Sequence, residues 1–235
     1  MAINGYRGKG YILRQIVLDT ETTGFQHSDG DKIVEIGCIE LENFLPTGNT
    51  FHQYINPERA MPLDAFKVHG LSGEFLAKFP NINDIIVDFL SFIGDDSELV
   101  IHNAQFDMGF INAELKALGR APIPMSRSID TVKLAREKFP GAPASLDALC
   151  RRFKVDNSGR ELHGALLDAE LLSEVYLELI GGKQPDFELS DQVKTLDIKK
   201  SEITARTPRS FKATDQEKAA HKEFLSKVKA PIWFN

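Results

Sequence analysis

The chain has 235 residues, of which 42% are hydrophobic, so we expect one domain with a sizeable core and an appendage. Its formal net charge of −6 argues against a broad basic surface that would hold nucleic acid unaided. Apolar runs are too short for a membrane span or a signal peptide, and Cys38 and Cys150 lie in apolar patterns typical of buried thiols, so we expect a soluble protein of the reducing cytoplasm.

The first informative stretch, residues 16–24, reads IVLDTETTG. Its three apolar residues predict the end of a strand buried on both faces, and Asp19 and Glu21 follow directly. Side chains two apart in an extended chain lie on the same face, so these carboxylates point into one small volume that calls for a cation. The alternative interpretation, usual for an isolated D-x-E, is a strand that ends in a solvated acidic loop.

Two more strands and three helical segments are predicted next. We expect strands over residues 33–41 and 50–55, the second after a turn at residues 46–48, as antiparallel neighbours of the first strand. Short helices are expected over residues 62–70 and 72–78. A longer helix follows Asn81, which is a suitable N-cap.

A strand over residues 98–101 leads into a helix that extends to Leu118. Asp107 precedes Phe110 and Ile111 by three and four residues, so it lies on the apolar stripe of this helix. An unpaired carboxylate there costs on the order of 2–7 kcal/mol, which suggests that something binds it. The alternative is a helix-start acid favoured by the macrodipole.

The last core elements are a short strand over residues 128–131 and helices over residues 131–139, 145–153 and about 165–180. Asp168 precedes Leu171 and Leu172 by three and four residues, so it is a second carboxylate on an apolar helix face. His163 lies five residues earlier, where Gly164 allows a turn. At this spacing His163 reaches the space in front of Asp168, although a lone histidine before a helix is usually structural or exposed.

Four carboxylates from three separate segments match the requirement for two divalent metal ions about 3.5–4 Å apart. Hard oxygen ligands favour Mg²⁺ or Mn²⁺, while the scarcity of cysteine and the lack of clustered histidines disfavour zinc. Such a pair activates a water and holds a phosphodiester. Histidine titrates near neutral pH, so His163 is suited to take the proton from that water.

Three motifs, DTE at residues 19–21, NAQFD at 103–107 and HGALLD at 163–168, resemble those of the DEDD exonuclease superfamily, histidine subclass. The resemblance implies an α/β, ribonuclease H-like fold with a central mixed β-sheet flanked by helices, and 3′-to-5′ removal of nucleotides. It implies two metal ions on Asp19, Glu21, Asp107 and Asp168, with His163 as general base. It also implies contacts to the terminal nucleotide from Thr20, Thr22, His69, Asn103 and Phe106. Without the resemblance, His69 would be interpreted as an exposed loop residue.

Residues 146–182 extend the likeness to the proofreading subunits of bacterial replicative DNA polymerases, so residues 1–182 are expected to form the exonuclease domain. A largely extended tail follows, in which residues 183–214 have the composition of a linker. Within it, residues 184–189 (QPDFEL) resemble sliding-clamp peptides through Gln184, Phe187 and Leu189. The resemblance leaves open whether a small third subunit binds the core.

Residues 215–235 are predicted to bind the polymerase alpha subunit through Trp233 and Phe234, which a solvated end has little reason to carry. A segment that folds back onto its own core is the alternative. From residue 183 onward, 11 Lys and Arg face 8 Asp and Glu, whereas the preceding part has 17 and 26. Such an acidic nuclease is expected to bind DNA weakly by itself. Tethering to a polymerase would raise the effective concentration of the DNA end at its site.

Three functions remain open at this point. The first is a proofreading exonuclease that trims mismatched DNA 3′ ends, because a frayed end needs no further unpairing. The second is a free-standing RNA-processing exonuclease of the same fold, which has no need of two peptide anchors. The third, a non-enzymatic scaffold, is disfavoured by the intact set of four carboxylates and His163.

Overall fold

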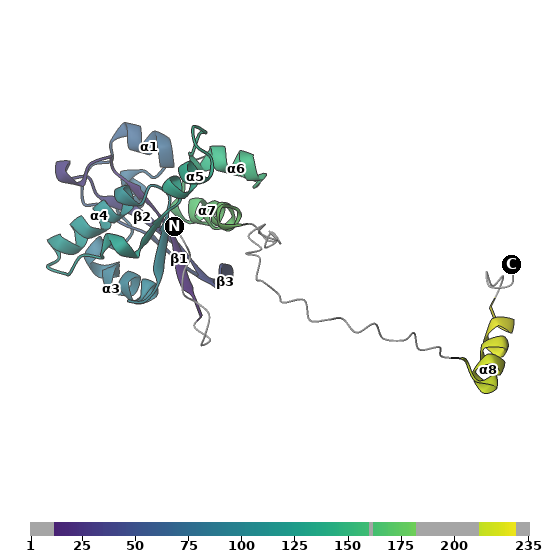
Figure 1. Ribbon diagram of the computed structural model, residues 1–235. Helices are drawn as coiled ribbons and strands as arrows, with labels where there is room; N and C mark the ends of the chain where they lie inside the picture. Colours follow the sequence, from purple (N-terminus) through teal and green to yellow (C-terminus); the bar gives the residue numbers. More distant parts are fainter. Residues whose placement is uncertain (1–11, 160–161, 182–211, 229–235) are drawn as a thin grey trace, which may run out of the picture. The chain divides into compact units, whose positions relative to one another are not determined.

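The computed structural model describes residues 12–159, 162–181 and 212–228. A mixed sheet has the strand order β3-β2-β1-β4-β5 (Figure 1). Its strands are β1 (Arg14–Thr22), β2 (Ile33–Glu42), β3 (Leu45–Tyr54), β4 (Glu98–Ile101) and β5 (Ser128–Asp130). The first three pair antiparallel, as predicted, whereas β4 pairs parallel to both β1 and β5. The carboxyl ends of β1, β4 and β5 therefore meet at one edge of the sheet.

Helices cover both faces of this sheet (Figure 1). They are α1 (Leu63–His69), α2 (Gly73–Leu76), α3 (Ile82–Ile93), α4 (Ala104–Ala117), α5 (Thr131–Lys138), α6 (Leu146–Phe153) and α7 (Ala165–Ile180). Ile16 and Leu18 pack with α3 and α4, while Val17 between them packs with α5, α6 and α7. The prediction of a first strand buried on both faces is thus confirmed, as is the burial of both cysteines.

The first strand is longer than predicted. Asp19 and Glu21 do not follow β1 but lie within it, because β1 continues to Thr22 and stays paired with β2 as far as Ile33. The β-branched Thr20 and Thr22 suit an extended, paired backbone, and a register shift occurs between Glu21 and Thr22. Sheet hydrogen bonds consequently fix the backbone that carries the two carboxylates.

The third strand also differs from the prediction, because residues 46–48 lie within β3 and do not form a turn. The chain reverses at Asn43 and Phe44, whose φ angles are 50° and 69°. β3 is an edge strand, so Pro46 can lack an N–H on the open side at no cost to the sheet. Its pairing with β2 shifts register between Ile39 and Leu41.

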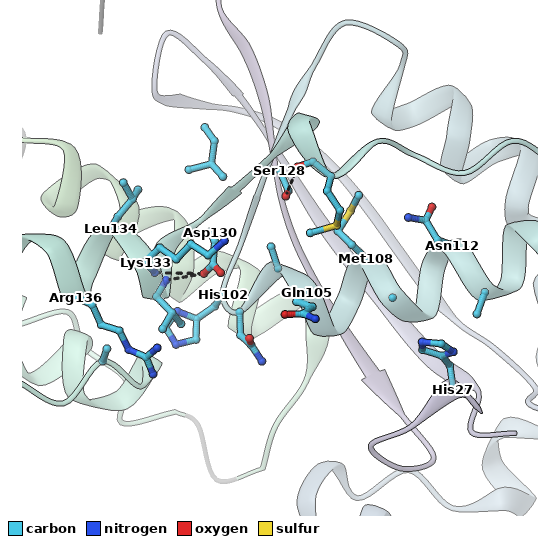
Figure 2. Close-up of a pocket in the computed structure, with 18 of the residues that line it drawn as sticks. His27, His102, Gln105, Met108, Asn112, Ser128, Asp130, Lys133, Leu134 and Arg136 are labelled. Atoms are coloured by element: carbon cyan, nitrogen blue, oxygen red, sulfur yellow. Dashed lines mark hydrogen bonds between the residues drawn. The ribbon is translucent and has the colours of Figure 1, made fainter. Parts of the chain in front are cut away.

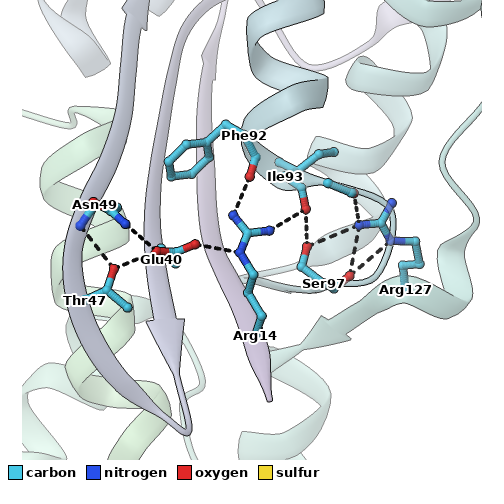
Figure 3. A network of polar contacts seen from close by, with 9 residues as sticks. Arg14, Glu40, Thr47, Asn49, Phe92, Ile93, Ser97 and Arg127 are labelled. Atoms are coloured by element: carbon cyan, nitrogen blue, oxygen red, sulfur yellow. Dashed lines mark hydrogen bonds and ion pairs between the residues drawn. The ribbon is translucent and has the colours of Figure 1, made fainter. Parts of the chain in front are cut away.

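A polar network ties the start of β1 to the end of α3 (Figure 3). Arg14 donates to Glu40 Oε1 at 2.6 Å and to the carbonyl oxygens of Phe92 and Ile93 at 2.6 and 3.0 Å. Arg127 donates to the carbonyl oxygen of Gly94 at 2.7 Å. These arginines satisfy carbonyls that the end of a helix leaves without an intrahelical partner. At the other end of α3, Asn81 forms the predicted cap.

A last helix, α8 (Asp215–Ser226), belongs to a separate part of the chain. Thr214 and Glu217 form a capping box at its start, and Phe224 is exposed. The predicted clamp peptide with Gln184, Phe187 and Leu189 lies outside the described residues, as do Trp233 and Phe234. The described helices include none that is long and apolar enough to cross a membrane.

Candidate active site

The first turn of α7 is packed directly against β2, and Gly37 makes this approach possible. A Cβ added at Gly37 would lie 2.3 Å from the backbone of both Ala165 and Leu166. Gly37 is also the β2 residue paired with Asp19. Because Asp168 lies one turn into α7, this contact brings it toward the strand that carries Asp19 and Glu21.

Glu21, His163 and Asp168 form the cluster at this place. One possible metal-ligand atom from each lies within 4.8 Å of the other two. His163 Nδ1 is 3.3 Å from Asp168 Oδ2, the Asp168 side chain is only 4% exposed, and the His163 side chain is 47% exposed. The His163 backbone N–H donates to the carbonyl oxygen of Val68 at 3.1 Å, which holds this segment against α1. The site therefore combines two buried carboxylates with a solvent-accessible imidazole.

Asp19 and Asp107 lie outside this group of three. Asp19 is half-buried and shares a strand face with Glu21. Asp107, in the first turn of α4, is 3% exposed. Its Oδ1 accepts hydrogen bonds from the backbone N–H of Thr20 at 3.1 Å and from the Thr20 hydroxyl at 2.7 Å. Asp107 is thus bound to the residue between the two β1 acids.

The surroundings of Asp107 disfavour its charged form. Burial raises the pKa of this carboxyl to about 7, although the hydrogen bonds from Thr20 oppose the shift. The negative charge of Asp130, at the end of β5, raises the pKa further. A nearby cation would favour the ionised carboxylate, so this environment is suited to a positively charged ligand.

His69, at the C-terminal end of α1, is buried beside the cluster and not in an exposed loop. Its Nδ1 accepts the N–H of Leu71 at 3.0 Å, so the neutral ring carries its proton on Nε2. Nε2 is buried, and among the described residues no acceptor meets the full geometry of a hydrogen bond, although the Thr22 carbonyl is close enough to act on the ring. Burial, together with the charge of His163, lowers the pKa of His69, while the Thr22 carbonyl opposes this. The ring is therefore a neutral donor whose Nε2–H is held only weakly, by the Thr22 carbonyl.

Asn103 and Phe106 border a small pocket of about 370 Å³ at the start of α4. Asn103 has φ 69° and ψ 57°, and its side chain is exposed. Phe106 packs on Phe110 with ring centroids 5.0 Å apart. Phe25, which is 83% exposed, lines the same pocket and was not singled out by sequence reasoning. Its only signal is an aromatic residue within a polar loop.

The remaining threonine of the predicted set, Thr22, has its hydroxyl engaged in the loop that follows β1. It donates to the carbonyl oxygen of Gly24 at 2.6 Å. The hydroxyl of Thr20 is likewise engaged, by Asp107. Any contact from these two residues to a nucleotide would use another atom or the hydroxyl lone pairs.

The donor set fits a divalent metal ion. Glu21 and Asp168 offer carboxylate oxygens at close range, and these are ligands that hard cations prefer. Cys38 and Cys150 take no part, because both are buried in the hydrophobic core. Asp19 lies on the same strand as Glu21, and Asp107 is hydrogen-bonded to Thr20 of that strand.

Comparison with known proteins defines the class. Residues 16–176 match the model of the Exonuclease family. The structure is similar to Exonuclease X in complex with 5′ overhanging duplex DNA, with TM-score 0.57 and 26% identity, over 71% of this chain and 91% of that one. It is also similar to the nuclease domain of 3′hExo, a DEDDh family member bound to rAMP, with TM-score 0.61 and 17% identity, over 74% and 94%. The chain is an exonuclease with the expected ribonuclease H-like fold.

Two relatives narrow this class. DNA polymerase III subunit epsilon of Rickettsia felis is 53% identical over 223 residues, which cover 92% of this chain and 97% of that protein. The protein of the same name from Escherichia coli K12 is 44% identical over 230 residues, with coverage of 92% and 94%. The chain belongs to the family of DNA polymerase III epsilon subunits, which are proofreading 3′–5′ exonucleases of the DEDDh type. Exonucleases of this type use divalent metal ions.

Proposed function

We propose that this chain removes mismatched nucleotides from DNA 3′ ends as the proofreading subunit of a bacterial replicative polymerase, and that it releases nucleoside 5′-monophosphates. The observation that carries the proposal is the cluster of Glu21, His163 and Asp168, with ligand atoms within 4.8 Å of one another. A histidine beside buried carboxylates in an exonuclease family is an arrangement suited to metal-assisted phosphodiester hydrolysis. The names of the relatives support DNA over RNA as the substrate.

His163 acts as general base in this proposal. Asp168 Oδ2, at 3.3 Å from Nδ1, orients the ring and stabilises the imidazolium that forms when His163 takes a proton. Because the side chain is about half exposed, water reaches the ring. The bond of the backbone to Val68 keeps the residue in place while it exchanges this proton with solvent.

We assign two divalent metal ions, Mg²⁺ or Mn²⁺, to the carboxylates Asp19, Glu21, Asp107 and Asp168. When bound, two such ions activate a water and stabilise the attacking and leaving oxygens of an in-line displacement. The chain contributes a rigid frame, since Asp19 and Glu21 are held within β1. Thr20 holds Asp107 by two hydrogen bonds, so its carboxylate keeps a fixed orientation.

The 3′-terminal nucleotide contacts Thr20, Thr22, His69, Asn103 and Phe106. The buried Nε2–H of His69 supports its part, because a buried donor with only a weak protein acceptor gains a hydrogen bond when a ligand accepts from it. Phe106 and the exposed Phe25 offer apolar ring surfaces on which a base can stack. Asn103 presents its amide at the same pocket.

The partners follow from the domain division proposed for the sequence. Residues 1–182 form the exonuclease domain, residues 183–214 the linker and residues 215–235 the polymerase-binding segment. The sliding clamp is bound through Gln184, Phe187 and Leu189. The polymerase alpha subunit is bound through Trp233 and Phe234. The protein acts in the cytoplasm. The proposal is compatible with a small third subunit that binds the exonuclease domain. The family's association with DNA polymerase III supports the replicative setting.

The direct test is digestion of a 5′-labelled single-stranded DNA by the full chain with Mg²⁺. We expect a ladder that shortens one nucleotide at a time, with nucleoside 5′-monophosphates as the product. Glu21→Gln is expected to reduce the rate at least a hundredfold, while Lys78→Ala, a change at an exposed residue outside the site, is expected to retain it. Internal cleavage products, or full activity of Glu21→Gln, would contradict the proposal.

A further inference from the structure

A large groove of about 2070 Å³ extends along α4 and α5 and over the ends of β4 and β5. Figure 2 shows Lys133 and Arg136 on one side of it and Asn112 on the other, with His102 and Gln105 between them. Glu21, His163 and Asp168 are not among its lining residues. The groove therefore lies beside the catalytic cluster and contains none of the residues assigned to the metal ions or to proton transfer.

Basic side chains gather in this groove. Two come from α4 or the turn after it and two from α5, namely Lys116, Arg120, Lys133 and Arg136. All four are exposed, and no ion pair engages them within the described residues. The acids of the lining are Asp130 and Glu137, and Asp130 caps α5 by accepting the N–H of Val132 at 2.9 Å. The groove thus has an excess of positive charge.

The positive charge of the groove contrasts with the negative net charge of the domain as a whole. Up to residue 182 the chain carries 26 Asp and Glu and 17 Lys and Arg. A random distribution of these residues over the surface would give an acidic groove, not a basic one. Exposed Asn103 and Gln105 add amide groups to the same lining. Cationic and amide side chains are the groups that most often contact the phosphates and sugars of nucleic acids.

The groove is continuous with the proposed nucleotide site. It shares His27, Asn103 and Gln105 with the smaller pocket, which Phe25 and Phe106 also line. Asp107 directly follows Phe106 on α4. A strand whose last nucleotide occupies the site can therefore pass from the smaller pocket into the groove without leaving the protein surface.

We propose that this groove binds the phosphodiester backbone of the DNA strand upstream of its 3′-terminal nucleotides, with Lys116, Arg120, Lys133 and Arg136 as the phosphate contacts. The inference rests on the proposed function, because it needs a 3′ end in the site. An acidic segment of a protein partner would carry the same negative charge as DNA. The continuity of the groove with the nucleotide pocket favours the substrate strand as its ligand.

The test compares two substrates of different length on the full chain. One is a dinucleotide, which fills the site alone, and the other is a single-stranded DNA of about twelve nucleotides, which also reaches the groove. The variants are Lys133→Ala with Arg136→Ala, and Lys116→Ala with Arg120→Ala. Arg136→Lys keeps the charge, and Lys78→Ala removes an exposed cation outside the groove.

We expect each double variant to lower kcat/KM for the long strand roughly five- to tenfold relative to the dinucleotide. The salt dependence of KM for the long strand should weaken, by about 0.7 in the logarithmic slope for each phosphate that the variant no longer neutralises. Arg136→Lys and Lys78→Ala should keep the wild-type ratio. An unchanged ratio in both double variants would overturn the inference and favour a protein ligand. Failure of the wild type to cleave either substrate would instead overturn the proposed function.

Discussion

Gly37 on β2 lies against Ala165, the first residue of α7, so closely that a Cβ at Gly37 would be 2.3 Å from the Ala165 backbone. This contact sets the position of the helix that carries Asp168 relative to the strand that carries Asp19 and Glu21. A single side-chain atom added at residue 37 would therefore push α7 away from β2. This movement would displace Asp168 in the active site.

Gly37→Val is expected to reduce both stability and activity. The added side chain must displace backbone that cannot move freely, so the free energy of unfolding should fall by about 1–3 kcal/mol or more. Activity should fall by a larger factor than stability alone explains, because Asp168 moves away from Glu21. Thermal unfolding and nuclease assays below the unfolding temperature measure the two effects. Gly159→Ala, where an added Cβ meets nothing within 4 Å, is the matched control.

His163→Ala is expected to lower turnover by roughly 10²–10⁴ while the protein stays folded, because the general base is lost and only a half-exposed ring is removed. Single-turnover rates on a short DNA, with circular dichroism as the control for folding, check this. Mn²⁺ binding should persist, since Glu21 and Asp168 remain. Full activity in this variant would remove His163 from the mechanism.

The Glu40 network predicts a defined pH dependence of stability. Hydrogen bonds from Asn49, then from Thr47 and Arg14, lower the pKa of Glu40 against the opposing effect of burial. A carboxyl whose folded pKa lies below its unfolded value of about 4.3 stabilises the protein above that pH, and the contribution is lost as the pH falls through the folded pKa. Thr47, Asn49 and Arg14 thus stabilise the sheet edge mainly through the ionised form (Figure 3).

Glu40→Gln should therefore be less stable than the wild type at pH 7, by about 1–2 kcal/mol from weakened charged hydrogen bonds. The difference in melting temperature should persist down to about pH 5 and narrow toward pH 3, as the wild-type carboxyl takes up a proton. A difference in melting temperature that stays constant from pH 7 to pH 3 would contradict this prediction. It would show that the charge of Glu40 does not contribute to stability.

Truncation after Gly182 should spare the hydrolysis of short single strands and abolish association with the polymerase. The elements that position the four carboxylates all end by Ile180, and the proposed anchors lie beyond residue 183. Co-purification with the polymerase alpha subunit measures the second effect. A truncated protein that still co-purified would show that the anchors lie in the exonuclease domain.

Sequence reasoning predicted most of the elements because they rest on local periodicity. The burial of Asp107 and Asp168 followed from their places on apolar helix stripes, and the structure confirms that burial. The extension of β1 through Glu21 depends on pairing with β2, which lies about ten residues away and has no local signal strong enough to set the strand end.

The parts that were missed depend on contacts between distant segments. The Thr20 hydroxyl bonds to Asp107 across 87 positions of sequence, which no spacing rule anticipates. Gly37 interrupts an apolar strand, a pattern that signals close approach, but the sequence does not say that the approaching element is α7. The exposure of Phe25 is likewise a property of the folded surface and not of its loop.

The most direct measurement of the central claim is the initial rate of 3′-nucleotide release with Mg²⁺ from three substrates of one sequence. These are a DNA primer with a mismatched 3′ end on its template, the matched primer, and a single-stranded RNA. The account predicts that the mismatched DNA end is trimmed fastest, because a frayed end enters the site without the cost of unpairing. Preference for RNA, with no difference between matched and mismatched DNA, would contradict it and favour a free-standing RNA exonuclease.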